Sequence, residues 1–194
     1  TTLGALDPHP HVARRNVDGY GVPNACQPLN LAVPAGEILG VVGQLGSGAD
    51  RLVEAIAGVR SHTGKLSIDS QQVDIQSPRK AISQGIAYVP EDRAGKGVFL
   101  EASIGQNSTA SILTKLTRFG RLENALERNA AHELMKRFTI DTKRINSKVS
   151  SLSGGNQQKV AMAKAAAISP KILILNEPTR GVDIGARAEI YAQL

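Results

Sequence analysis

The run LSGGNQQK at residues 152–159 combines residue types that suit the binding of a phosphate group. Two adjacent glycines, Gly154 and Gly155, open an alanine-rich stretch that we expect to be helical. Glycine leaves the backbone N–H groups unhindered, and the N-terminus of a helix carries a partial positive charge. Ser153 adds a hydroxyl donor. Together these groups favour an anion such as a phosphate.

A second polar group follows the apolar run Ile172 to Leu175 in the sequence KILILNEPT. The unbroken apolar run predicts a strand that is buried on both faces of a parallel sheet. Asn176 and Glu177 come where this strand should emerge, and open α/β sheets bind ligands at that edge. The two motifs in this order therefore indicate a ligand site.

A glycine-rich turn, GQLGSGAD at residues 43–50, follows another apolar run and precedes an expected helix. It resembles the pattern G-x-x-x-x-G-K-[ST], in which backbone N–H groups converge on phosphate oxygens. The last two positions differ, because Ala49 stands in place of the lysine and Asp50 in place of the hydroxyl residue. The candidate phosphate-contacting residues are Gly43, Gly46, Ser47, Gly48, Ala49 and Asp50.

Three interpretations of this turn remain open. Loss of the lysine and gain of the Asp50 carboxylate predict a crippled nucleotide site, since two negative charges roughly 4 Å apart repel by about 1 kcal/mol even in water. Alternatively, Arg51 or a partner's basic residue replaces the lysine, although Arg51 is one residue out of register, a rotation of about 100° on a helix. In the third interpretation the turn is merely structural.

The elements that position these residues predict an α/β fold with a RecA-like parallel-sheet core. Three apolar runs of strand length, Ile38 to Val42, Ile86 to Val89 and Ile172 to Leu175, should be neighbouring strands of one parallel sheet. We expect this core to occupy residues 16–90 and 169–194, after a flexible leader over residues 1–15.

An inserted helical lobe is expected between the strands, over residues 91–168. Within it, residues 123–138 have Leu126, Ala130, Leu134 and Phe138 at four-residue spacing. That spacing predicts a helix with one apolar face, in a lobe separate from the sheet.

Composition excludes several other classes of protein. The formal charge of +6 comes from 23 basic and 17 acidic residues spread along the chain, and only three Phe, three Tyr and no Trp could stack on bases, so we expect no nucleic-acid partner. No apolar run approaches the roughly 20 residues that cross a bilayer. The single cysteine, Cys26, predicts neither an internal disulfide nor a zinc site.

With these motifs in this order, the chain resembles an ATP-binding cassette (ABC) ATPase over nearly its whole length, residues 17–194. Leu152 to Gln157 match the signature motif of that family, and Ile172 to Glu177 match its Walker B strand. The resemblance implies ATP and Mg²⁺ as cofactors, with Glu177 as the general base for the attacking water. Asn176 stands where the family's aspartate orders the magnesium shell, which implies a weakened metal site.

The resemblance extends to three other positions. Glu91, in YVPEDR, occupies the place of the Q-loop, which couples the nucleotide to the transmembrane partner. Asp183 is similar to the acidic residue of the D-loop, which crosses the dimer interface. Tyr20 resembles the aromatic residue that stacks on adenine, and a merely packed ring is the alternative. The family's switch-histidine segment would lie beyond Leu194, so we expect a truncated cassette.

The runs YVPEDR, LSGGNQQKVAMAKA and EPTRGVDIGARAEIY resemble the second cassette of the tandem ATPases that drive bacterial monosaccharide importers of the ribose, galactose, xylose and autoinducer-2 type. That cassette commonly has an aberrant phosphate loop and a good signature. Cassettes of the family dimerise head to tail, with each ATP between one P-loop and the other signature. The resemblance therefore implies that Ser153, Gly154 and Gly155 complete the ATP site of a partner cassette, with Gln157 as a further contact.

The implied partners are a second cassette, transmembrane permease subunits and, indirectly, a sugar-binding protein, with the chain peripheral on the cytoplasmic face of the membrane. Three alternatives remain. A regulatory module would bind nucleotide, or nothing, without hydrolysis. A nucleoside-type importer would differ in cargo. A DNA-maintenance ABC protein would carry a coiled-coil insertion or zinc-coordinating cysteines, and the sequence has neither.

Overall fold

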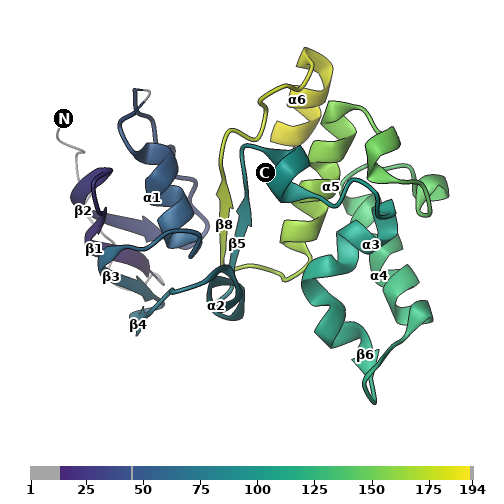
Figure 1. Ribbon diagram of the computed structural model, residues 1–194, viewed down its shortest axis with the longest axis horizontal. Helices are drawn as coiled ribbons and strands as arrows, with labels where there is room; N and C mark the ends of the chain where they lie inside the picture. The colour runs from purple at the N-terminus through teal and green to yellow at the C-terminus, as the bar shows by residue number, and fades with distance from the viewer. Residues whose placement is uncertain (1–13, 45, 193–194) are drawn as a thin grey trace. The chain divides into compact units, whose positions relative to one another are not determined.

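The computed structural model describes residues 14–44 and 46–192, in which helices and strands are mixed along the chain (Figure 1). The chain divides into two compact units, Thr1–Gln84 and Gly85–Leu194. Most of the predicted leader lies outside the described residues, and its last two residues, Arg14 and Arg15, begin the first strand. The division into a core and a helical lobe stays a prediction.

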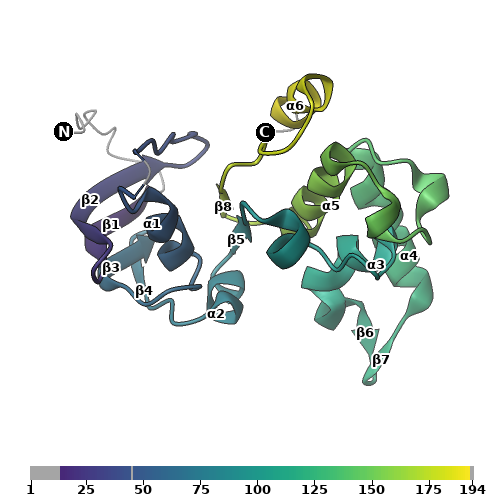
Figure 2. The same ribbon diagram turned by 45° about the horizontal axis from the view of Figure 1, so that its top comes forward.

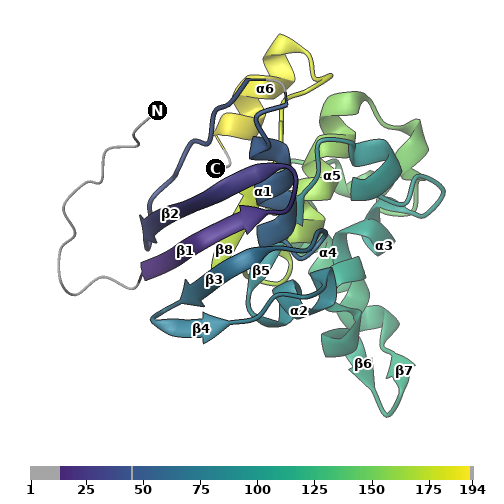
Figure 3. The same ribbon diagram turned by 60° about the vertical axis from the view of Figure 1, so that its left-hand side comes forward.

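The first unit contains a four-stranded antiparallel sheet. Its elements are β1 (Arg14–Val22), β2 (Cys26–Pro34), α1 (Ala49–Ile56), β3 (Thr63–Ile68), β4 (Gln71–Val73) and α2 (Pro78–Ser83). Figure 3 shows the strands side by side in the order β2-β1-β3-β4. Leu66 and Ile68 of β3 are buried and Ser67 between them is not, as alternation along a strand requires. Helix α1 packs on this sheet and buries Leu52 and Ala55.

The second unit contains a short parallel sheet with helices beside it. Strand β5 (Ile86–Val89) pairs in parallel with β8 (Ile172–Leu175), so the prediction that these two runs are neighbouring strands is confirmed. Figure 2 shows helices α3, α4 and α5 on one side of the two strands. The helices are α3 (Ile104–Thr109), α4 (Asn124–Arg137), α5 (Gly154–Ala166) and α6 (Ile184–Tyr191). The shorter elements are a π-helix (Arg93–Gly97), three 3₁₀ helices (Ala110–Leu116, Thr142–Arg144 and Val149–Ser151) and the hairpin β6 (Thr117–Arg118) and β7 (Arg121–Leu122).

One hydrophobic core joins the strands and helices of the second unit. Val89 of β5, Met135 of α4 and Val160 of α5 are at most 1 % exposed and belong to the same cluster, against which Leu175 of β8 packs. This shared core packs β5, β8, α4 and α5 together. No helix in the described part of the chain is long and apolar enough to cross a bilayer.

The apolar face of α4 agrees only in part with the predicted one, in that Phe138 is buried and Leu134 packs against the core. The helix itself is confirmed, but its buried residues are Ala131 and Met135, followed by Phe138 just after its end. Leu126, a predicted core residue, is 46 % exposed. Both sets have helical spacing, and packing against α3 and α5 selects the face that is buried.

The predicted strand Ile38 to Val42 is wrong. These residues form no strand, and the side chains of Ile38 and Val42 are 86 % and 96 % exposed. A run of apolar residues becomes a strand when neighbouring strands satisfy its backbone N–H and C=O groups. Among the described elements β5 and β8 pair only with each other, so this run has no place in their sheet. Hydrophobicity marked the run as a possible strand but gave no information about its hydrogen-bonding partners.

Removal of a reciprocal cap should weaken α3. The Ser103 hydroxyl accepts the Gln106 N–H at 3.1 Å, and the Gln106 side chain accepts the Ser103 N–H at 3.0 Å. We expect Ser103→Ala to lower the free energy of unfolding by about 1 kcal/mol, because one helix N–H loses its acceptor. Urea denaturation measures this, with Ser111→Ala in the following 3₁₀ helix as the control. Equal unfolding midpoints for the two variants would contradict the expectation.

Candidate functional site

The glycine-rich turn of the first unit folds tightly and leads into α1, as the sequence predicted. The Ser47 N–H donates to the Gln44 carbonyl oxygen at 2.9 Å. Gly48, which precedes α1, has a φ of +84°, and a Cβ on it would lie 2.3 Å from the carbonyl oxygen of Ala25. A Cβ on Gly43 would lie 2.1 Å from the Ser47 hydroxyl oxygen. The turn itself therefore requires glycine at residue 48, whether or not a phosphate binds, whereas a side chain at residue 43 would require the Ser47 hydroxyl to move.

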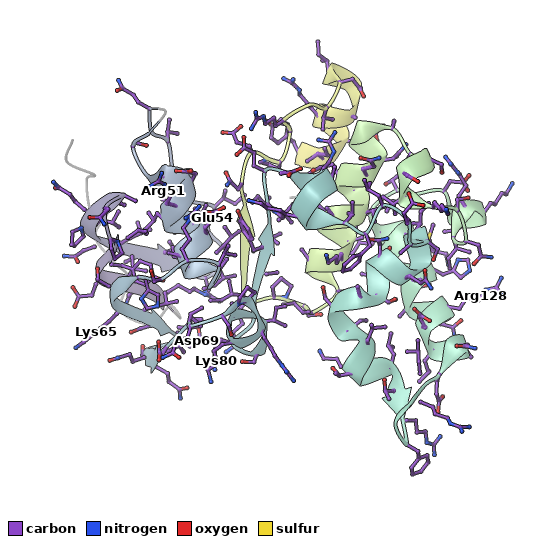
Figure 4. All side chains as sticks on the ribbon, viewed as in Figure 1. Arg51, Glu54, Lys65, Asp69, Lys80 and Arg128 are labelled. Carbon is purple, nitrogen blue, oxygen red and sulfur yellow. The ribbon has the colours of Figure 1, made fainter. Side chains whose placement is uncertain are left out.

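The turn presents no lysine to a phosphate. Ala49 is the first residue of α1, and Asp50 places an exposed carboxylate in its first turn. Arg51, the candidate replacement cation, is exposed on the same helix, where Figure 4 shows it near Glu54. Among residues 14–44 and 46–192, no three His, Cys, Asp or Glu side chains gather as a metal site would need. A weakened magnesium site at this turn stays a prediction.

The start of α5 in the second unit is open at Ser153. This residue is exposed, directly precedes the helix and makes no side-chain hydrogen bond to the helix backbone. Its hydroxyl oxygen accepts a hydrogen bond from the Asn156 side chain at 3.1 Å. Because the first N–H groups of a helix have no partner within the helix, an uncapped end of this kind suits an anion.

The two glycines that follow have different neighbours. A Cβ on Gly154 would lie 2.6 Å from an Nη atom of Arg93 and 3.0 Å from the Gly181 carbonyl oxygen. A Cβ on Gly155 would lie 2.7 Å from the Cβ of Ala186 on α6. Packing against α6 therefore requires glycine at residue 155, whereas a side chain at residue 154 would displace the end of the Arg93 side chain and crowd the Gly181 carbonyl oxygen.

The side-chain amide of Gln157 forms hydrogen bonds with the backbone just before α5. Nε2 donates to the carbonyl oxygens of Val149 at 3.3 Å and Leu152 at 3.2 Å. These bonds join α5 to the segment before it, which gives Gln157 a structural role. Its contact with a nucleotide stays a prediction.

Asn176 and Glu177 lie at the end of β8, beside the end of β5. The Asn176 N–H donates to the Val89 carbonyl oxygen at 3.0 Å, and its side-chain amide donates to the Tyr88 hydroxyl at 3.4 Å. Glu177 has a φ of +48°, which is uncommon for a residue other than glycine. Its carboxylate is exposed. The structure thus places an amide and an accessible proton acceptor at one sheet edge.

The segment after β5 is tied to the loop after β8. Glu91 forms an ion pair with Arg180, and Arg93 donates hydrogen bonds to the backbone of the same loop. Asp183 accepts the Ala186 N–H at 2.9 Å and so caps α6. Sequence reasoning missed Arg93 and Arg180, although both lie within the quoted runs YVPEDR and EPTRGVD. Separations of 87 and 88 residues hide such contacts from local patterns.

A family model for ABC transporters matches residues 26–180. The matched residues include the glycine-rich turn, the open end of α5 and the end of β8. The chain belongs to the ABC transporter family.

Two relatives of this ABC chain are import proteins. It is 47 % identical over 165 residues to the xylose import ATP-binding protein of Geobacillus kaustophilus, across 84 % of this chain and 33 % of that protein. It is 41 % identical over 177 residues to the ribose import ATP-binding protein of Pseudomonas putida, across 91 % of this chain and 35 % of that protein. The chain spans about a third of the length of these relatives.

Solved ABC structures share its fold. A dimeric ATP-binding cassette in a post-hydrolysis state, bound to ADP and phosphate, has a TM-score of 0.77 at 22 % identity and covers 92 % of this chain and 80 % of its own. A nucleotide-free cassette from an ABC transporter has a TM-score of 0.78 at 16 % identity, with coverage of 93 % and 75 %. The predicted α/β fold class, a RecA-like core of the ABC type, is confirmed.

Tyr20 is not open to an adenine ring in this ABC chain. It lies in β1 with 0 % of its surface exposed, and its ring centroid is 4.6 Å from that of His62. Burial, with a smaller effect of Asp74, raises the pKa of its hydroxyl well above the usual range. The adenine-stacking prediction is therefore wrong, because the core of the first unit covers this ring.

Lys164, on the signature helix α5 of this ABC chain, should make stability depend on pH. Its ammonium group donates to the Gly97 carbonyl oxygen at 2.8 Å and lies 4.7 Å from the Phe99 ring centroid, and burial lowers its pKa from 10.5. The folded chain then binds fewer protons than the unfolded chain between the lowered pKa and 10.5, so stability should rise with pH in that window.

We expect Lys164→Met to flatten this rise and Lys115→Met, at an exposed position, to leave it unchanged. Urea denaturation at a series of pH values measures both slopes. Equal slopes in the two variants would contradict the assignment.

Proposed function

We propose that this chain is the energy-coupling cassette of a bacterial importer for a simple sugar. The relatives that carry xylose and ribose import in their names support the cargo class. Because the chain spans about a third of those proteins, the activity, cargo and partners of the whole protein all belong to this proposal. A nucleoside-type cargo is the alternative. The observation that carries the proposal is a contrast between two helix starts. The start of α5 at Ser153 is exposed and uncapped, whereas the glycine-rich turn before α1 lacks a lysine.

In this proposal, the start of α5 acts on ATP that is held by a partner cassette. The Ser153 hydroxyl and the N–H groups of Gly154 and Gly155 donate to the γ-phosphate. Donors that are fixed before the reaction stabilise developing negative charge without reorganising. The packing of Gly155 against α6 and the limited space beside Gly154 support such a fixed arrangement. ATP supplies the phosphoryl group whose transfer to water drives the transport cycle.

The chain's own turn contributes less in this proposal. Asp50 repels a polyphosphate, and Ala49 gives it no cation. Asn176 contributes no negative charge to Mg²⁺, so metal binding is weak at this turn. Glu177 remains as an exposed proton acceptor. A chain with these residues should bind ATP weakly and hydrolyse it poorly by itself.

The proposed partners follow from this arrangement. They are a cassette with an intact phosphate loop, permease subunits and, through them, a sugar-binding protein, with the chain peripheral at the cytoplasmic face of the membrane. The Glu91 segment is the proposed contact with the permease, and Asp183 is proposed to lie at the interface between cassettes.

A stimulation experiment tests the proposal against the regulatory-module alternative. ATP hydrolysis by a partner cassette with an intact phosphate loop is measured alone and with an equimolar amount of this chain. We expect at least tenfold stimulation, which corresponds to about 1.4 kcal/mol of transition-state stabilisation. Nucleotide binding by this chain without stimulation would favour the regulatory module.

A further inference from the structure

One arginine contacts two functional segments of the second unit. Arg93 lies directly after the Glu91 position, at the start of the π-helix. One Nη atom donates to the Arg180 carbonyl oxygen at 2.7 Å, and the other donates to the Gly181 carbonyl oxygen at 3.3 Å. The Glu91 carboxylate pairs with the side chain of the same Arg180. Two residues of one segment therefore hold the loop at Arg180 and Gly181. Glu91 binds a side chain of the loop, and Arg93 binds its backbone carbonyl groups.

The same guanidinium group lies beside the start of α5. A Cβ on Gly154 would come within 2.6 Å of the Arg93 Nη atom that also bonds Gly181. The guanidinium thus occupies the space that a side chain at residue 154 would need. A shift of Arg93 would change the environment of Gly154 and Gly181 together, because one planar group bonds the Gly181 carbonyl oxygen and fills the space beside Gly154.

The backbone around Arg93 is itself constrained. The Asp92 side chain accepts the Gly95 N–H at 3.0 Å, and the Val98 N–H donates to the Arg93 carbonyl oxygen at 2.9 Å. The Nε atom of Arg93 is buried and has no hydrogen-bond partner in the part of the chain that the structure describes. A desolvated guanidinium nitrogen without a partner costs free energy. The hydrogen bonds from the two Nη atoms to the Arg180 and Gly181 carbonyl oxygens offset this cost.

We infer that Arg93 is a positioning residue that holds the loop at Arg180 and Gly181 and the start of α5 in the arrangement that acts on a partner's nucleotide. This inference rests on the proposed function. It adds that Arg93 links the segment at Glu91 to the start of α5, which faces the phosphate in that proposal. Arg93 acts through Gly154 and Gly181 and need not touch the nucleotide.

The first measurement is amide hydrogen exchange on the purified chain. The Arg180 N–H, bonded to the Glu177 carbonyl oxygen at 3.0 Å, and the Val182 N–H, bonded to the Thr179 carbonyl oxygen at 3.3 Å, report on the loop. We expect Arg93→Gln to speed their exchange about tenfold, because the loop opens locally, and to leave exchange in the core of α5 unchanged.

Arg128→Gln provides a matched control, since Arg128 is exposed on α4 and Figure 4 shows its position there. Arg93→Lys keeps the charge but loses the planar pair of donors, so its exchange should be intermediate. If Arg93→Gln does not fold, the comparison of Arg93→Lys with wild type decides. Equal loop exchange in the position-93 variant and the Arg128→Gln control would overturn the inference.

The second measurement is ATP hydrolysis by the assembled importer. Arg93→Gln should lower kcat about 100-fold, because misplacement by about 1 Å has effects of this size, and leave the KM for ATP within about twofold. Arg93→Lys should recover part of kcat. An unchanged kcat, or a loss expressed only in KM, would overturn the positioning role. If wild-type hydrolysis does not depend on this chain, the proposed function fails, while the exchange measurement still decides whether Arg93 holds the loop.

Discussion

Ser153→Ala should lower ATP hydrolysis by the assembled importer by about two to three orders of magnitude. Loss of one preorganised donor to a developing negative charge has effects of this size in other enzymes. Ser153 is exposed, and among the described residues its hydroxyl has one hydrogen-bonding contact, with Asn156 within the same turn. The variant therefore removes a donor without disturbing the core.

The measurement is the steady-state ATPase rate of the reconstituted importer. Ser150→Ala, at an exposed serine of the preceding 3₁₀ helix, is the matched control and should leave the rate unchanged. Ala49→Lys in the same assembly should matter much less than Ser153→Ala. If Ser153→Ala keeps full activity and residue 49 controls the rate instead, the shared-site proposal fails.

Glycine substitutions are a less specific test of the same site. Alanine at Gly154 would place its Cβ 2.6 Å from Arg93 and 3.0 Å from the Gly181 carbonyl oxygen. Alanine at Gly155 would place its Cβ 2.7 Å from Ala186. Both changes would disturb the chain itself before any partner binds. Loss of hydrolysis in either variant could therefore come from altered packing.

The double substitution Ala49→Lys with Asp50→Thr should raise the affinity of the purified chain for ATP about 100-fold. A charge-assisted contact with phosphate contributes about 1.5 to 3 kcal/mol, or one to two decades in affinity. Removal of the Asp50 carboxylate adds about 1 kcal/mol by ending its repulsion. Isothermal titration of wild type and variant with ATP measures the change.

Arg51→Gln is the control for the interpretation in which Arg51 replaces the lysine. This variant should bind ATP as weakly as wild type, because Arg51 lies beyond the register of the missing lysine on α1. A further loss of affinity in Arg51→Gln would show that Arg51 serves as the cation. Vigorous hydrolysis by the purified wild-type chain, abolished by Glu177→Gln, would contradict the crippled-site interpretation.

Local sequence determined much of the candidate site. The positions of Gly154 and Gly155 at the start of a helix, and of Asn176 and Glu177 at the end of a strand, followed from composition and apolar patterning. The turn before α1 followed from its glycines. These features are local because helix ends, strand ends and tight turns depend on neighbouring residues in the chain.

Tertiary structure decided which apolar residues are buried and which distant residues meet. Ile38 to Val42 and the run at β8 are equally apolar in sequence, yet only the second has a partner strand. Tyr20 is buried in the first unit, with its ring beside His62, which lies 42 residues further along the chain. Arg93 meets Arg180 across 87 residues of sequence. Sequence alone specified the helix ends and turns that can bind phosphate. Non-local packing and hydrogen bonding determined which contacts hold these elements in place. The reason is that local sequence patterns do not encode partners that are distant in the chain.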